Sequence, residues 1–160
     1  IKANGTGMAL PKDPAFLFYK DFEMQSNIRL PGNASAGFVV RARDKDNYYL
    51  IKLTGNTAEE PFRVSAIMVK NGKPSGRVLW ETTRHIIEKA VNEQMFFEVV
   101  IRAKGNTFEL FARDEKGALQ PLGNAVFRDN NYPIGAVGIG SLENTNFEVN
   151  YFVVCNEICR

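Results

Sequence analysis

Hydrophobic and polar residues alternate with a period of two along most of the chain, in short runs that end at turn-forming residues. Alternation of this kind turns one side of an extended segment toward a core and the other toward water, so each run predicts a β-strand. A spacing of about 8–15 residues between such runs is typical of an antiparallel sandwich or barrel. The predicted strands cover residues 21–30, 36–42, 48–53, 62–70, 96–103, 107–113, 135–141 and 146–154.

The segments between the predicted strands carry turn signals. Asn71-Gly72 strongly favours a two-residue hairpin, because both residues tolerate a positive φ. A helix would fit only residues 84–94, and we expect either a strand or a single helical turn there. No linker, low-complexity segment or block of charge interrupts residues 1–160, so the sequence predicts a single all-β domain.

One local pattern recurs: a phenylalanine and a glutamate followed by an apolar residue. Within a strand, the phenylalanine and the apolar residue share the side that faces the core, whereas the glutamate points the other way into water. The spacings are irregular, so alternation explains the recurrence better than an internal repeat does. The four copies are Phe22-Glu23-Met24, Phe97-Glu98-Val99, Phe108-Glu109-Leu110 and Phe147-Glu148-Val149.

The stretch AGFVVRARDKDNYYLIKL (residues 36–53) predicts a hairpin that carries an unusual set of polar side chains. Phe38 marks the core face of its first strand, so Arg41 and Arg43 are expected to emerge side by side on the opposite face. Guanidinium groups in such a position are well suited to donate paired hydrogen bonds to a sugar.

Across the turn, alternation places Tyr48 and Lys52 beside the arginines on the outer face and turns Tyr49 inward. Ser65 and two further residues, Arg63 and Trp80, would extend this surface, and an aromatic ring packs well against the C–H face of a sugar. The alternative is an ordinary solvated sheet face. The candidate ligand-binding residues are therefore Arg41, Arg43, Tyr48, Tyr49, Lys52, Arg63 and Trp80.

The polar turn itself raises the question of a calcium site. Asp44, Asp46 and Asn47 offer oxygen ligands at close spacing. An EF-hand loop would need a glycine and a glutamate where Tyr49 and Gly55 stand, so a site of that type is excluded. A looser calcium site is one interpretation, and a turn whose side chains bond their own backbone is the other.

Signals for catalysis are weak. A glycosidase needs two carboxyl groups on either side of the scissile bond, and Glu98, Glu109 and Glu148 would meet only through cross-strand pairing. His85 is the single histidine and has no recognisable nucleophile motif beside it. The glycines of residues 135–140 precede a loop and a strand rather than a helix, so they predict close backbone approach and not a phosphate site.

Composition narrows the possible partners. The net charge is +2 and the basic residues are scattered, which argues against nucleic acid or an anionic membrane as the partner. No segment approaches the roughly 20 apolar residues that span a bilayer. Cys155 and Cys159 form either a local disulfide or two free thiols, and a disulfide would favour an exported protein. The chain begins at Ile1, so we expect it to be a segment of a longer protein.

Residues 36–53 resemble a motif of the concanavalin A-like jelly-roll superfamily. Laminin-G-like and sugar-associated bacterial members carry a run that reads Ser-Gly-hydrophobic-x-x-Arg-x-x-Asp-x-x-Asn-Tyr-Tyr. The chain is similar to bacterial domains of the family-66 carbohydrate-binding-module type and the 3-keto-disaccharide hydrolase type. The matching residues are Ala36, Gly37, Phe38, Arg41, Asp44, Asn47, Tyr48 and Tyr49.

Later segments extend the resemblance over residues 20–154. FFEVVIRAKGNTFELFA, RDNNYPIGAVGIGS and NFEVNYFVV are similar to the family's later strands, with Asp129, Gly135 and Gly138 at the matching positions. The final strand departs from the family's Phe-Asp-Asp or Phe-Asp-Asn, because Glu148 follows the phenylalanine here. No acidic role is therefore carried over to this strand.

The resemblance implies a jelly-roll β-sandwich of two antiparallel sheets. It also implies a non-catalytic carbohydrate-binding or sensing module that needs no cofactor, cut from a larger exported bacterial protein and located outside the cell or in the periplasm. Arg41, Arg43 and Lys52 would donate hydrogen bonds to a carbohydrate or other polyol on the concave sheet. Tyr48 or Tyr49, together with Trp80, would stack on it. The alternatives are a glycoside hydrolase and a protein-interaction or structural domain.

Overall fold

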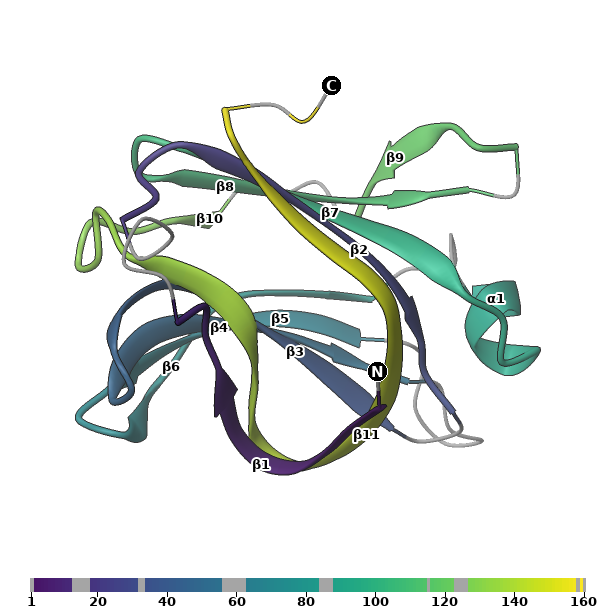
Figure 1. Cartoon of the computed structure of the whole chain (residues 1–160), viewed down its shortest axis with the longest axis horizontal. Helices are drawn as coiled ribbons and strands as arrows, with labels where there is room; N and C mark the ends of the chain where they lie inside the picture. The colour runs from purple at the N-terminus through teal and green to yellow at the C-terminus, as the bar shows by residue number, and fades with distance from the viewer. Residues whose placement is uncertain are drawn as a thin grey trace.

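The computed structural model describes residues 2–12, 18–31, 34–55, 63–83, 88–114, 116–122, 127–157 and 159, with the backbone alone at 2–6, 76–83, 88 and 142–145. Strands dominate these ranges, and one short helix accompanies them (Figure 1). The elements are β1 (Lys2–Ala9), β2 (Phe22–Arg29), β3 (Ser35–Asp44), β4 (Asn47–Thr54), β5 (Arg63–Lys70), β6 (Lys73–Thr83), α1 (Glu88–Asn92), β7 (Phe97–Lys104), β8 (Thr107–Arg113), β9 (Leu119–Pro121), β10 (Phe127–Arg128) and β11 (Ala136–Asn156).

The strands form a β-sandwich of two antiparallel sheets (Figure 1). The β4 sheet contains the start of β11 followed by β3, β4, β5 and β6, and the β7 sheet contains the end of β11 followed by β2, β7, β8 and β10. Strand β11 joins the two sheets, because its 21 residues curve from a partner in one sheet, β3, to a partner in the other, β2. The short strand β9 extends the β7 sheet beside β8.

The core lies between the inner faces of the two sheets. The phenylalanines of the four Phe-Glu copies are all at most 5% exposed and belong to one apolar cluster, as the alternation predicted. Their glutamates point to the outer face of the β7 sheet. Glu23 corrects one part of that prediction, because it is 1% exposed rather than solvated. It accepts hydrogen bonds from Gln25 and Arg102, which cover it.

Glycines allow three backbones to approach closely where β11 passes β3 and β1. A Cβ atom on Gly138 would lie 2.3 Å from the backbone oxygen of Ala9, and one on Gly37 would lie 1.8 Å from that of Gly140. Neither position has room for a side chain. The glycines therefore mark close backbone approach, as the sequence predicted.

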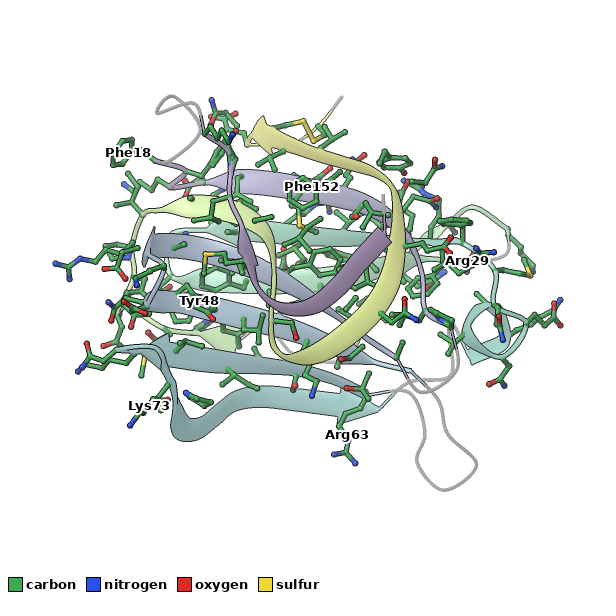
Figure 2. The ribbon with its side chains drawn as sticks, turned by 60° about the horizontal axis from the view of Figure 1, so that its bottom comes forward. Phe18, Arg29, Tyr48, Arg63, Lys73 and Phe152 are labelled. Carbon is green, nitrogen blue, oxygen red and sulfur yellow. A yellow bond between two sulfur atoms is a disulfide. The ribbon has the colours of Figure 1, made fainter. Side chains whose placement is uncertain are left out.

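The end of β1 covers part of the outer face of the β4 sheet. Met8 and Leu10 pack there on a second apolar cluster, which contains Val39, Ala42, Tyr48, Leu50, Val69 and Ala136. Figure 2 shows the curve of β1 lying over this part of the sheet. As a result, this face of the β4 sheet is apolar and closed near the β3–β4 turn.

Six of the eight predicted strands match β2, β3, β4, β5, β7 and β8 within two residues at each end. The remaining two, 135–141 and 146–154, are parts of the single strand β11. Asn71 and Gly72 both have a positive φ, which confirms the predicted hairpin. Residues 88–92 form a helical turn, and the rest of that prediction, 84–87, lies outside the described residues. Strands β1, β6, β9 and β10 were not predicted.

The glycine contacts generate a test. Replacing Gly37 with alanine should lower the free energy of unfolding by at least about 2 kcal/mol, because the added carbon must displace a backbone oxygen. Urea unfolding followed by circular dichroism measures the loss. Lys70→Ala, at an exposed position on β5, is the control and should change stability by less than about 0.5 kcal/mol. Equal stability of the two variants would contradict this packing.

Candidate functional site

Arg41 is buried, not exposed as the sequence predicted. Its side chain is 0% exposed and is the largest of the fully buried side chains. The cause is a bulge: three residues of β3 stand opposite one residue of β4 between the pairs Val40–Tyr49 and Asp44–Asn47. Arg41 adopts a φ of 51° in this bulge, which turns its side chain to the same side as that of Val40. Simple alternation therefore fails at this residue.

The buried guanidinium of Arg41 links two segments that are far apart in the sequence. It donates hydrogen bonds to the backbone oxygens of Lys20, at 2.7 Å, and of Tyr132, at 3.5 Å. It also lies 4.6 Å from the centroid of the Phe108 ring. Burial lowers the pKa of Arg41, and neighbouring Tyr49 and Asp21 oppose that shift. These contacts identify Arg41 as a structural residue.

Tyr49 completes the same buried network. Its hydroxyl donates to Asp129 at 2.5 Å and accepts from the backbone N–H of Tyr132 at 3.0 Å. The hydroxyl of Tyr132 in turn donates to the backbone oxygen of Val69 at 2.8 Å. Burial, and then the hydrogen bond to Asp129, raise the pKa of Tyr49. Arg41 and Tyr49 of the motif in 36–53 thus hold the loop before β11.

The other residues of the predicted surface do not form one site. Tyr48 does lie on the outer face, but it is 5% exposed beneath the end of β1. Arg43 is exposed near the turn, whereas Lys52 and Arg63 lie toward the opposite end of the sheet, where Lys52 pairs with Ser65 (Figure 2). Ligand binding by Arg43, Lys52 and Arg63 stays a prediction. The same holds for Trp80, whose backbone pairs with Ala66 and whose side chain lies outside the described part.

The polar turn of the hairpin has its own hydrogen bonds. Asp44 accepts hydrogen bonds from the backbone N–H of Asp46, at 2.8 Å, and from the side-chain amide of Asn47. The side-chain oxygen of Asn47 accepts from the backbone N–H of Asn71 at 3.2 Å. Among the described residues, no group of three or more His, Cys, Asp or Glu side chains is placed to hold a metal ion. Calcium binding at this turn stays a prediction.

The outer face of the β7 sheet carries an anchored tyrosine that the sequence analysis did not single out. Tyr151 on β11 pairs with Asn27 on β2, which in turn pairs with Glu98 on β7. The hydroxyl of Tyr151 donates to Glu98, two strands away. Since β11 and β7 are about 9.6 Å apart, the ring must extend across the sheet over Asn27 rather than stand upright. It is 36% exposed and offers a ring surface to solvent.

A second bulge explains why Tyr151 was missed. Alternation from Phe147 and Val149 would turn Tyr151 toward the core. The register of β11 shifts between Val149 and Tyr151, so Phe152 faces the core instead (Figure 2). The signal that would have indicated this bulge is that simple alternation puts two apolar residues, Phe152 and Val154, on the outer face, whereas both pack against the core.

Three arginine–glutamate pairs lie on the same sheet face as the tyrosine. They join Arg113 to Glu98, Arg29 to Glu148 and Arg102 to Glu23, with N–O distances of 2.5–2.7 Å. In each pair the carboxylate is the more buried partner: the glutamate side chains are 2–22% exposed and the arginine side chains 34–42%. The face therefore presents guanidinium donors whose charge is already balanced.

Two of these arginines also lie against aromatic rings. The Arg29 guanidinium is 5.1 Å from the centroid of the Phe96 ring, and that of Arg102 is 4.8 Å from the centroid of Phe111. Phe96 is itself exposed. Rings, guanidinium groups and the side-chain amides of Asn27 and Asn150 thus share one sheet face, which we call the tyrosine face.

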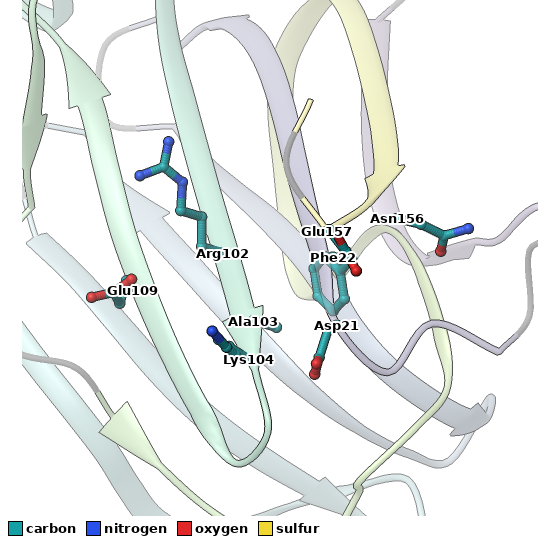
Figure 3. Close-up of a pocket in the computed structure, with 8 residues that line it drawn as sticks. All are labelled: Asp21, Phe22, Arg102, Ala103, Lys104, Glu109, Asn156 and Glu157. Atoms are coloured by element: carbon teal, nitrogen blue, oxygen red, sulfur yellow. The ribbon is translucent and has the colours of Figure 1, made fainter. Parts of the chain in front are cut away.

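A pocket lies at one end of this sheet, with a volume of about 760 Å³. It forms where the β7–β8 hairpin, the start of β2 and the end of β11 meet (Figure 3). Arg102 belongs both to the pocket and to the tyrosine face. The lining residues are Asp21, Phe22, Arg102, Ala103, Lys104, Glu109, Asn156 and Glu157.

Cys155 and Cys159 form a disulfide beside this pocket. Of the two alternatives that the sequence left open, a local disulfide and two free thiols, the structure has the disulfide. The Sγ atom of Cys159 lies 3.5 Å from the backbone oxygen of Glu23. Among the described residues, no helix is long and apolar enough to cross a membrane.

No protein-family model and no curated protein matches the amino-acid sequence. Solved structures match the fold. The family-66 carbohydrate-binding module of Bacillus subtilis has a TM-score of 0.68 at 18% identity, over 95% of this chain and 83% of that one. Sheep galectin-11, in complex with glycerol, has a TM-score of 0.59 at 8% identity, over 97% of this chain and 96% of that one.

An enzyme is among the matches as well. The xylan β-1,4-xylosidase of Bacillus halodurans has a TM-score of 0.56 at 14% identity. The match covers 93% of this chain and 29% of the enzyme. Together these likenesses confirm the predicted fold, a jelly-roll β-sandwich of two antiparallel sheets.

The structural role of Arg41 gives a matched test. Arg41→Ala should lower the free energy of unfolding by about 3 kcal/mol or more, because it leaves a cavity and two backbone oxygens without their donor. Arg43→Ala, two residues away and exposed, should change it by less than about 0.5 kcal/mol. Urea titrations of both variants measure the difference. A stable Arg41→Ala protein would contradict the buried network.

The tyrosines predict how stability depends on pH. Burial raises the pKa of all five above the ordinary value of 10.0, and raises that of Tyr151 to about 12. Between pH 10 and about 12 the folded state keeps tyrosine hydroxyl protons that the unfolded state loses. The contribution of the tyrosines to the free energy of unfolding is therefore complete below pH 10 and decreases as the pH rises toward 12. Ultraviolet titration of tyrosinate should show the shift in buffer and its loss in urea. Titration near the ordinary value in the folded protein would be inconsistent with these environments.

Proposed function

We propose that the domain binds a carbohydrate, or another polyol, on the tyrosine face without chemically changing it. The observation that carries the proposal is the ring of Tyr151, held across the sheet by its bond to Glu98 and exposed to solvent. A ring fixed before binding loses little conformational freedom when a ligand packs on it. The C–H face of a sugar is a natural partner for such a ring.

The surroundings of Tyr151 supply hydrogen bonds for hydroxyl groups. Arg113 and Arg29 are oriented by their glutamates and are partly exposed, so each has N–H groups available for a ligand. Asn27 and Asn150, whose side chains bond each other at 3.3 Å, contribute both donors and acceptors. This mixture suits hydroxyl groups, which donate and accept at once.

The fold likeness to a carbohydrate-binding module and to galectins supports sugar as the ligand class. A non-catalytic role is supported by the ion pairs, because Glu98 and Glu148 are engaged by arginines rather than directed at open space. Glu109 lies apart from both, at the pocket. We therefore place the hydrolase that the sequence left open second to a binding module.

We also propose a location and a context. The disulfide between Cys155 and Cys159 supports an extracellular or periplasmic protein, because thiols stay reduced in the cytosol. The likeness to a Bacillus module supports a bacterial origin and a parent chain with further domains. In that setting the domain would bring its parent protein to a glycan.

A thermal-shift screen against neutral and acidic mono-, oligo- and polysaccharides, each with and without calcium, identifies the ligand. A ligand at one hundred times its dissociation constant adds about 2.7 kcal/mol, which raises the melting temperature by several degrees. Calorimetry with the best ligand then tests the face. Tyr151→Ala should weaken binding about tenfold or more, equivalent to ~1.4 kcal/mol.

Two variants serve as controls for Tyr151→Ala. Phe18→Ala removes an even more exposed aromatic ring elsewhere, 69% against 36% for Tyr151, and should leave the affinity unchanged. Lys52→Ala tests the surface that the sequence predicted on the β4 sheet. A loss of affinity in Lys52→Ala with none in Tyr151→Ala would move the site to that sheet and reject the tyrosine face.

A further inference from the structure

We propose that the pocket at the end of the β7 sheet is a second polyol-binding site, and that the Cys155–Cys159 disulfide holds one of its walls in place. The proposal shares the ligand class and one residue, Arg102, with the proposed function, and concerns the end of the sheet away from Tyr151. Figure 3 shows Asp21 between the hairpin residues Lys104 and Glu109 on one side and Asn156 on the other.

The polar groups of the pocket point to a ligand rich in hydroxyls. Asp21, Glu109 and Glu157 provide acceptors, whereas Lys104 and Arg102 provide donors. A hydroxyl group can satisfy both kinds of partner, but a simple cation or anion would meet like charges on one side. The volume of about 760 Å³ lies within the range of ordinary small-molecule sites.

Two hydrogen bonds to Asp21 preform the pocket in the absence of a ligand. The backbone N–H of Gly105, in the β7–β8 turn, donates to the carboxylate of Asp21 at 2.9 Å. The backbone N–H of Glu157 donates to the backbone oxygen of Asp21 at 3.2 Å. Asp21 therefore joins the hairpin wall to the wall formed by the end of β11.

The disulfide closes the chain around two lining residues. Asn156 and Glu157 lie between Cys155 and Cys159, whose Cα atoms are 5.2 Å apart. Glu157 has a φ of 65°. A residue other than glycine adopts this conformation at a cost in free energy, and the conformation persists only where the surrounding structure holds it. The cross-link and the contact of Cys159 with Glu23 supply that constraint. Without it, this wall has fewer restraints on its position.

Although Arg102 borders both, the pocket and the ring of Tyr151 are too far apart for one monosaccharide. Asn27, over which the Tyr151 ring extends, is five residues along β2 from the pocket residue Phe22, or about 17 Å. Two independent binding events are therefore expected, each with its own reporters.

Amide NMR spectra of the 15N-labelled protein, titrated with glucose, galactose, fructose, xylose and glycerol, test the pocket. At least one of these probes should shift the amides of Gly105 and Glu157 in a saturable way. Glu109→Gln should weaken that binding at least fivefold. The Cys155→Ser/Cys159→Ser double variant should weaken it as well, and Phe18→Ala should not.

The outcomes separate this proposal from the proposed function. Shifts at Gly105 and Glu157 that persist in Tyr151→Ala support the pocket, even if that variant abolishes every shift near Asn27. Saturable shifts near Asn27 with none at Gly105 and Glu157 would overturn the pocket and leave the tyrosine face standing. Pocket binding that is unchanged in the double cysteine variant, with its fold confirmed by the same spectra, would overturn the role of the disulfide.

Discussion

The structure depends on a charged side chain placed inside the sandwich. Burying a guanidinium is costly unless its N–H groups find partners. The two terminal nitrogens of Arg41 donate to the backbone oxygens of Lys20 and Tyr132, whereas its buried Nε–H has no hydrogen-bond partner among the described residues. Lys20 belongs to the segment that leads into β2 in the β7 sheet, and Tyr132 belongs to the segment that leads into the start of β11 in the β4 sheet. One residue of the β4 sheet thus holds the segments that enter β2 in one sheet and β11 in the other, and Tyr49 reinforces the second of these links through Asp129.

This arrangement decides which surface is available for a ligand. The residues of the hairpin that look most like a sugar site are used to build the fold, and the end of β1 closes the outer face above Tyr48. The opposite sheet differs: its outer face keeps an exposed ring, three oriented arginines and several amides in the open. The glutamate side chains of these pairs are largely buried, and they bind the arginines and the tyrosine that a ligand would contact. In the proposed function, ligand contacts would therefore lie on the β7 sheet, whereas the polar residues of the β3–β4 hairpin stabilise the fold.

Alternation of apolar and polar residues was sufficient to predict the strands and the core, because each Phe-Glu copy follows the period of a strand. It failed at Arg41 and at Tyr151 for the same physical reason: a bulge adds residues to one strand and interrupts the alternation of side chains there. Strand β1 was missed because its glycines and polar residues conceal the alternation, so the burial of Tyr48 was missed with it. Pairing between distant strands, which brings Glu98, Arg113 and Tyr151 together, leaves no local signal in the sequence.

The central claim is that ligands bind the outer face of the β7 sheet. A crystal structure of the domain with the best oligosaccharide from the screen tests it most directly. The account predicts sugar density over the ring of Tyr151, with hydroxyl groups within hydrogen-bond distance of Arg113 or Arg29. Density on the outer face of the β4 sheet, beside Lys52 and Arg63, with the tyrosine face empty and free of lattice contacts, would contradict it.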